Sequence, residues 1–122
     1  MMYIEKKWNN MEYQEYTMPK ITNRLIELPA SIAKSEYDWE IEKIELETLE
    51  ADLINEIDNT IYKNAEMRQA FINSNAGYLI QAKKVVKLRV EYHKLINEKD
   101  CLFEIARNKR AEMKSQIDSI KE

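Results

Sequence analysis

The 122-residue chain contains one glycine, two prolines, one cysteine and one histidine. β-Sandwiches, β-barrels and glycine-rich nucleotide-binding folds depend on turn residues that this composition does not supply, so these classes are excluded. A single glycine cannot form a phosphate-binding loop. Cys101 has no second cysteine with which to form an intrachain disulfide, and Cys101 with His93 provides too few ligands for a zinc site built by this chain alone.

Long hydrophobic runs are also missing. No run approaches the ~18 apolar residues that a membrane span requires, and the first residues lack the apolar region of a signal peptide. We therefore expect a cytoplasmic protein with no membrane partner. The net charge of -3 is too small to predict nucleic-acid binding from the total alone.

The chain offers no arrangement typical of catalysis. Ferritin-like metal bundles use a glutamate followed three residues later by a histidine, which the pair Glu91 and His93 does not match. A cysteine nucleophile needs a nearby histidine, but Cys101 and His93 would lie roughly 12 Å apart along one helix. We predict a non-enzymatic protein without a cofactor or a metal.

What the chain does have is a long helical stripe from Tyr78 to Ile120, without proline or glycine. Its positions seven apart are Tyr78, Val85, Tyr92, Lys99, Ala106, Met113 and Ile120, and all but the lysine are apolar or aromatic. Apolar residues three or four positions further on complete one continuous stripe. A helix of this length runs roughly 60 Å and needs a long partner.

A second long helix is predicted over residues 29–58, with Pro29 in its first turn, where the missing N–H is not needed. This helix carries two apolar seams on roughly opposite faces. The first seam consists of Tyr37, Ile41, Ile44 and Ala51, and the second seam consists of Ile32, Trp39, Leu46, Leu53 and Ile57. A helix with two apolar seams has two neighbours.

A two-helix hairpin alone would leave one seam in water, and such a patch normally marks an interface. Either a third helix of the chain or another copy must cover it. We predict a homo-oligomer whose interface, to itself or to a partner, contains Trp39, Leu46, Leu53, Ile57, Tyr78, Val85 and Tyr92.

The connection between the long helices predicts a short helix over residues 65–73. Asn64 is its expected N-cap, and Met67, Ala70 and Phe71 are its expected buried residues. The Asn- and Gly-containing stretch 73–77 then breaks the chain, so the two long helices should pack antiparallel. The predicted fold is all-α: a long antiparallel, coiled-coil-like helical hairpin over residues 29–122.

The N-terminal part, residues 1–28, is predicted as an arm followed by a short helix over residues 21–28. Two runs rich in aromatic residues, 3–8 and 11–17, flank Asn9-Asn10, and asparagine tolerates the backbone conformation of a two-residue hairpin. A small β-hairpin and an irregular arm are both compatible with this pattern.

Charge is distributed unevenly. Residues 36–58 contain ten acidic residues against Lys43 alone, a balance of -9, whereas residues 63–114 contain twelve basic and six acidic residues, a balance of +6. The favoured explanation is that an acidic and a basic helix lie side by side, within the chain or across an oligomer. Alternatively, the acidic face imitates nucleic acid. Lys83, Lys87 and Lys94 share one outer face, which is either a solvated ridge or a nucleic-acid contact.

The segment Lys63-Asn64-Ala65-Glu66-Met67-Arg68, followed by a break and by the long helix from Tyr78, resembles a group of small helical proteins encoded by phages and prophages of Gram-positive bacteria. These proteins are often encoded among recombination and replication genes. The resemblance covers about residues 60–115. It implies a non-enzymatic accessory protein of phage DNA metabolism in a bacterial host cell, with Asn64, Arg68 and Tyr78 as a recurring feature. Asn64 and Arg68 can instead serve only as a helix cap and an ion-pair partner of the acidic helix.

These observations predict an interaction protein that acts in phage DNA recombination or replication through protein–protein contacts. Its expected partners are further copies of itself and a phage or host DNA-processing protein. Two alternatives remain: an inhibitor of a host nucleic-acid enzyme that uses the acidic face, and a helical protein that binds nucleic acid directly.

Overall fold

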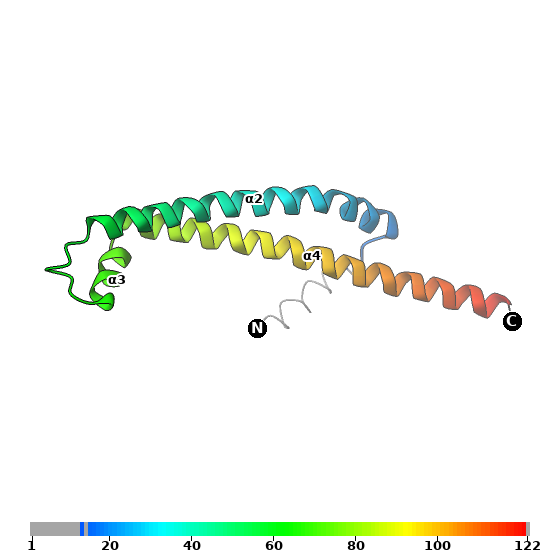
Figure 1. Cartoon of the computed structure of the whole chain (residues 1–122). Helices are drawn as coiled ribbons and strands as arrows, with labels where there is room; N and C mark the ends of the chain where they lie inside the picture. The colour runs from blue at the N-terminus through cyan, green and yellow to red at the C-terminus, as the bar shows by residue number, and fades with distance from the viewer. Residues whose placement is uncertain (1–12, 14, 122) are drawn as a thin grey trace. The chain divides into compact units, whose positions relative to one another are not determined.

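The computed structural model describes residue 13 and residues 15–121, and all of their regular structure is helical (Figure 1). Helix α2 spans Met18–Glu56, α3 spans Ala65–Asn73 and α4 spans Ala76–Lys121. The predicted all-α fold with a pair of long helices is confirmed. The suggested β-hairpin falls largely outside the described residues, and residues 15–17, which are described, form no strand.

The chain divides into two packed units, each built on a pair of segments from α2 and α4. The first unit combines Met1–Ala33 with His93–Glu122, and the second unit is Lys34–Tyr92. Within the second unit, Trp39 contacts Tyr92, whereas Glu42, further along α2, contacts Lys84, which comes earlier in α4. The two segments are therefore antiparallel, as predicted.

Helix α2 is continuous where two helices were predicted. The expected break at Pro29 is wrong, because Pro29 lies inside α2. An interior proline removes one backbone hydrogen bond and costs about 3 kcal/mol in a helix. Here the ring is exposed, and the neighbouring Leu28 and Ile32 belong to a packed core, so burial on the other face holds the helix together.

The start of α2 follows the expected rules for helix termini. Thr17 is its cap: the Thr17 hydroxyl accepts a hydrogen bond from the Lys20 N–H at 3.4 Å, and the Thr17 carbonyl accepts one from the Ile21 N–H at 3.0 Å. Pro19 sits in the first turn, where an N–H has no partner within the helix.

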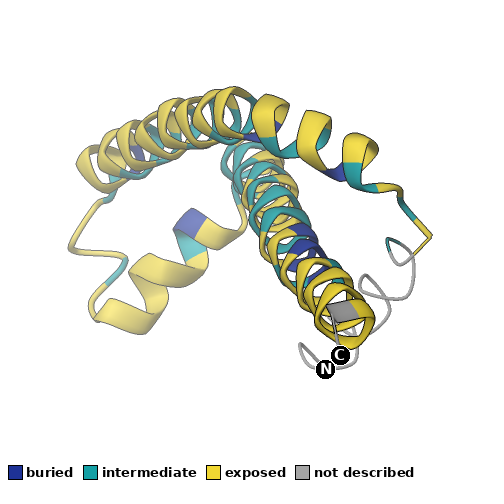
Figure 2. Cartoon of the chain, turned by 90° about the vertical axis from the view of Figure 1, so that its right-hand side faces the viewer, coloured by how far each residue is buried: buried dark blue, intermediate teal, exposed yellow. Residues whose placement is uncertain are grey.

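The first unit has an apolar core between α2 and α4. Its buried members are Ile21, Leu28, Leu102, Ile105 and Ala106. Figure 2 shows buried positions, in dark blue, on both helices. Full burial of a Leu or Ile side chain contributes about 1.5–3 kcal/mol. The core is therefore the main source of stability in this unit.

The second unit has fewer buried side chains, Leu53 on α2 and Ile72 on α3. Helix α3 has the predicted bounds, and its predicted cap is confirmed: the Asn64 side-chain oxygen accepts a hydrogen bond from the Met67 N–H at 2.9 Å. The predicted burial of Met67 and Ala70 is wrong, because both are exposed.

Helix α3 packs through its last turn rather than along a whole face. Phe71 is half-buried, and the centre of its ring lies 5.0 Å from the centre of the Tyr62 ring. Ile72 is only 3% exposed. Asn75 then caps α4, because its side-chain oxygen accepts a hydrogen bond from the Tyr78 N–H at 2.9 Å. Gly77, expected to help break the chain, lies in the first turn of α4 without a positive φ.

The stripe on α4 is present but not covered along its whole length. Leu102, Ile105 and Ala106 are buried, whereas every residue from Arg110 to Ile120 is exposed. We call residues 107–120 the α4 extension.

Candidate interaction surfaces

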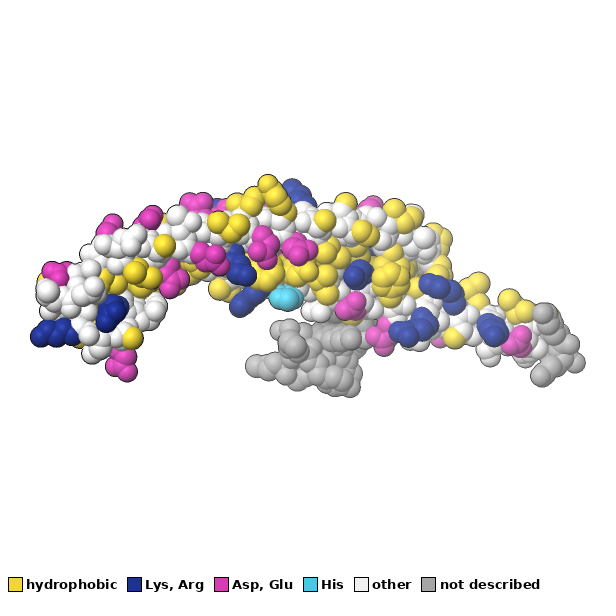
Figure 3. Space-filling model, viewed as in Figure 1, with side chains coloured by type: hydrophobic (Ala, Val, Ile, Leu, Met, Phe, Trp, Pro, Cys, Tyr) yellow, Lys and Arg dark blue, Asp and Glu magenta, His cyan; other side chains and the backbone are white. Residues whose placement is uncertain are grey.

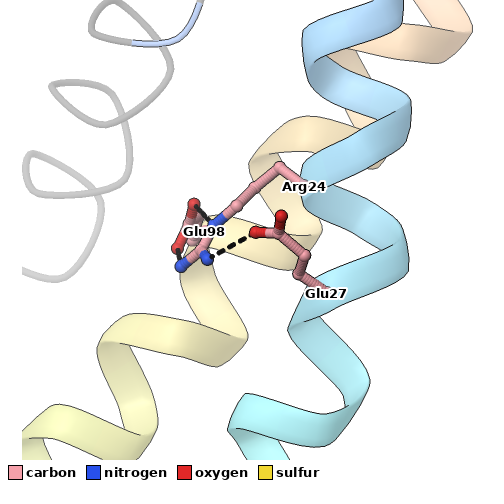
Figure 4. Close-up of polar contacts among 3 residues, drawn as sticks. All are labelled: Arg24, Glu27 and Glu98. Atoms are coloured by element: carbon pink, nitrogen blue, oxygen red, sulfur yellow. Dashed lines mark hydrogen bonds and ion pairs between the residues drawn. The ribbon is translucent and has the colours of Figure 1, made fainter.

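Arg24 of α2 and Glu98 of α4 form a bidentate ion pair in the first unit (Figure 4). Arg24 Nε donates to Glu98 Oε2 at 2.6 Å, and a terminal guanidinium nitrogen donates to Glu98 Oε1 at 2.8 Å. Glu27, one turn further along α2, lies 3.5 Å from the same guanidinium. The hydrogen bonds and negative charge of Glu98 raise the pKa of Arg24, so the guanidinium stays charged at any physiological pH.

A shallow pocket of about 410 Å³ lies beside this ion pair. Lys20 Nζ sits 3.9 Å from the centre of the Tyr16 ring, which is a cation–π contact. The pocket is lined by Tyr16, Lys20, Asn23, Arg24, Glu27 and Glu98. Both cations of the pocket already have partners, because Lys20 faces the Tyr16 ring and Arg24 faces Glu98. Neither is therefore available to hold an anionic ligand.

In the second unit, Glu42 occupies a polar position of the helix pair. Gln81 donates from its side-chain amide to Glu42 Oε2 at 2.7 Å, and Lys84 Nζ lies 3.0 Å from Glu42 Oε1. The hydrogen bonds from Gln81 and Lys84 lower the pKa of the Glu42 carboxyl. Glu42 therefore links α2 to α4, whereas Glu40, Glu45 and Glu47 are exposed.

Trp39 and Tyr92 stack next to this polar link, with ring centres 5.5 Å apart and planes tilted by 32°. Lys43 Nζ lies 5.8 Å from the centre of the Trp39 ring. A shallow groove of about 370 Å³ runs past them, lined by Trp39, Lys43, Leu46, Glu47, Glu50, Val85, Val86 and Arg89.

The two apolar seams of α2 differ in exposure. In the second seam, Leu53 is buried and Trp39, Leu46 and Ile57 are half-buried. In the first seam, Tyr37 is 66%, Ile41 41% and Ile44 59% exposed. The chain therefore covers the second seam and leaves the first in contact with solvent.

The residues predicted to form an oligomer or partner interface lie mostly within the chain's own helix pair. Trp39 contacts Tyr92, and Leu46 and Val85 line one groove. Tyr78 and Ile57 are half-buried, as are Val85 and Tyr92. A second copy would meet the exposed first seam more readily than these side chains.

The first seam is flanked by negative charge. Glu40 and Glu47 lie on one side of it and Glu45 and Asp52 on the other, and all four are exposed. Figure 3 shows hydrophobic side chains on the outer side of α2 with acidic side chains among them. A cleft next to the seam is lined by Ile41, Ile44, Glu45 and Thr48.

The α4 extension shows the opposite combination. Met113 is 55%, Ile117 51% and Ile120 84% exposed. Its basic residues are Arg107, Lys109, Arg110 and Lys114, against Glu112 and Asp118. Figure 3 shows basic and hydrophobic side chains alternating along this part of the chain.

The remaining predicted site residues are exposed. Lys83, Lys87 and Lys94 all lie on the solvent side of α4. Asn64 caps α3, as its structural explanation required, whereas Arg68 makes no ion pair with the acidic helix in the described part of the chain.

Sequence reasoning missed two polar links, Arg24 with Glu98 and Glu42 with Gln81 and Lys84. A signal for Glu42 was present: counting alternately three and four residues from Ser35 passes through Trp39, Glu42 and Leu46, so a carboxylate stands within the inward row. The same count runs back through Ile32, Leu28, Leu25 and Ile21, and it would also have indicated one continuous helix through Pro29.

Among the described residues, no group of three or more His, Cys, Asp or Glu side chains could hold a metal ion. None of the helices in that part of the chain is both long and apolar enough to cross a membrane. No protein-family model matches the sequence, and comparison with curated proteins and with solved structures found no similar protein.

Proposed function

We propose that the protein is a non-enzymatic interaction protein of the bacterial cytoplasm that assembles through helix–helix contacts and acts in phage DNA recombination or replication. The observation that carries the proposal is the exposure of the first seam of α2. Tyr37, Ile41 and Ile44 form an apolar strip that the helix pair of the second unit leaves uncovered.

The spacing of the first seam favours a helical partner. Tyr37, Ile41 and Ile44 are separated by four and three residues, and Thr48 and Ala51 continue the same alternation. This is the spacing with which one helix packs along another in a coiled coil. An exposed Tyr with two Ile on one strip also fits the enrichment of aromatic side chains at interfaces.

The charge beside the seam limits the partner. Glu40, Glu45 and Glu47 would lie at the rim of any helix docked there. A partner helix with basic residues at its own rim is favoured, and an acidic one is rejected. The setting in phage DNA metabolism comes from the resemblance of residues 60–115 to phage-encoded accessory proteins.

Proximity labelling in phage-producing cells tests the proposal. We expect the wild-type protein to label its own copies and proteins of DNA recombination or replication. A variant carrying Ile41→Arg and Ile44→Arg should lose that labelling, because two charges then occupy the seam. Ile80→Arg is the matched control, since Ile80 is 70% exposed on α4, away from the seam. Labelling without any DNA-processing protein would contradict the proposed setting.

The second candidate is an inhibitor of a host nucleic-acid enzyme, favoured by the acidic residues that stay exposed. In the described part of the chain, Glu42 is the only acidic residue of 36–58 in an ion pair with α4. The exposed Glu45, Glu47 and Asp52 would then imitate phosphates. Their replacement by lysine should abolish inhibition with the helical circular dichroism unchanged, whereas replacing Glu42 would also disturb the link to Gln81.

A further inference from the structure

We propose that the α4 extension of a second copy of this chain covers the first seam of α2. The inference rests on the proposed function, for which it names the partner in assembly. Each copy would contribute an acidic seam through Tyr37, Ile41 and Ile44 and a basic helix through Met113, Ile117 and Ile120.

Both surfaces are exposed and have the same apolar spacing. Met113, Ile117 and Ile120 are separated by four and three residues, as are Tyr37, Ile41 and Ile44. All six side chains are at least 41% exposed. Two helices with this spacing can pack side by side along about two turns, with the apolar residues of each between those of the other.

The charges beside the two strips are opposite. On a helix with 3.6 residues per turn, Glu40 and Glu45 flank the first seam on its two sides. On the α4 extension, Lys109 lies on one side of the strip, in the helical position that Glu40 and Glu47 have beside the first seam, and Lys114 lies on the other side, in the position of Glu45. Two first seams would repel each other, and so would two extensions, so the charges select the mixed pair.

These charges are not used up within the chain. In the described residues, Glu40, Glu45, Glu47 and Asp52 make no ion pair, and neither do Arg107, Arg110 and Lys114. Within one copy, therefore, the acidic residues beside the first seam and the basic residues of the α4 extension are left without ion-pair partners in the described residues. A mixed pair between copies would provide these partners.

The α4 extension is already helical. Helix α4 runs without a break from Ala76 to Lys121, so residues 107–120 are formed before docking. A preformed helix loses less conformational freedom on binding than a disordered segment. Because the same chain supplies both complementary surfaces at equal concentration, a second copy is the partner that the charges point to.

Three charge-reversal variants test the pairing in the full-length chain by sedimentation velocity over a range of concentrations. The acidic-extension variant carries Arg107→Glu, Arg110→Glu and Lys114→Glu. The basic-seam variant carries Glu40→Lys, Glu45→Lys and Glu47→Lys. The control variant carries Lys83→Glu, Lys87→Glu and Lys94→Glu, a matched reversal of three exposed lysines on α4 outside the extension. Circular dichroism checks that all remain helical.

We expect the wild type and the control variant to self-associate. For the acidic-extension variant and the basic-seam variant, we expect the association constant to fall by about tenfold or more. Mixing the acidic-extension and basic-seam variants should restore assembly, because every extension then meets a seam of opposite charge. Raising the salt concentration should weaken the wild-type assembly.

A wild type that stays monomeric at every concentration would overturn the inference. Association that survives both charge reversals would also overturn it, and so would a mixture of the two variants that does not assemble. A contact between seam and extension that forms within one chain, independently of the protein concentration, would overturn it too. The proposed function is judged separately: a monomeric protein whose labelling of DNA-processing proteins still depends on Ile41 and Ile44 would keep that function and discard the second copy as partner.

Discussion

The two units pair segments of the same two helices, yet they are held together differently. Among its described residues, the first unit buries five side chains in one cluster and adds the bidentate pair of Arg24 with Glu98. The second unit buries Leu53 and Ile72 and places Glu42 in the inward row of α2. The first unit therefore provides most of the intrinsic stability, whereas the second has polar links and an uncovered apolar strip.

The largest expected effect is on the apolar cores. Leu102→Ala in the first unit should lower the free energy of unfolding by about 2–5 kcal/mol, because Leu102 is fully buried and its removal leaves a cavity. Leu53→Ala in the second unit should cost less, since fewer buried side chains surround Leu53. Urea unfolding followed by circular dichroism at one protein concentration measures both losses.

Leu79→Ala is the control for these substitutions, because Leu79 is 43% exposed and its loss should cost less than about 1 kcal/mol. If Leu53→Ala proved more damaging than Leu102→Ala, the second unit would be the more strongly packed one and the comparison would be reversed.

A smaller effect is expected from the ion pair of the first unit. The side chain of Glu98 is 13% exposed and that of Arg24 is 32% exposed. Arg24→Met should cost about 1–3 kcal/mol, because it leaves a poorly solvated carboxylate without its partner. The double variant Arg24→Met with Glu98→Leu should cost less than the two single changes together.

A double-mutant cycle in urea measures this coupling. Single changes that simply add would show that the two side chains contribute independently and that the short contact carries no coupling energy.

The smallest effect concerns the polar link of the second unit and depends on pH. The folded protein lowers the pKa of Glu42 through hydrogen bonds from Gln81 and Lys84. A lowered pKa means that the stabilisation is fully present above the ordinary value of 4.5 and is lost as the pH falls through the lower folded value. The Glu42→Gln variant should therefore lose less stability than the wild type between neutral pH and about pH 3.

Thermal unfolding of both proteins across that pH range is the measurement, with Glu56→Gln as control because Glu56 is exposed. An identical pH dependence in wild type and Glu42→Gln would mean that the link to Gln81 and Lys84 contributes nothing to folding.

Periodicity predicted the helices better than it predicted their ends and partners. The seven-residue spacing of apolar residues from Tyr78 to Ile120 predicted α4, and Asn64 as an N-cap predicted the start of α3, because both signals are local. Pro29 misled the prediction, since its local cost was weighed without the burial of Leu28 beside it.

Two further features depended on long-range contacts. The sequence showed two seams on α2 but not which of them α4 would cover, because that depends on the register of the two helices. The pair Arg24 with Glu98 was hidden for the same reason: its residues are 74 positions apart, and only packing brings them together.

Pro29 also lowers the cooperativity with which the two parts of α2 unfold locally. Without an N–H on Pro29, the carbonyl of Leu25 loses the donor that an unbroken ladder would provide. The position of this missing backbone hydrogen bond, at Pro29, lies about one turn before the division between the two units at Ala33. Fraying that begins on one side of it need not spread across, so amide protons before and after Pro29 would exchange with solvent at rates set by separate openings.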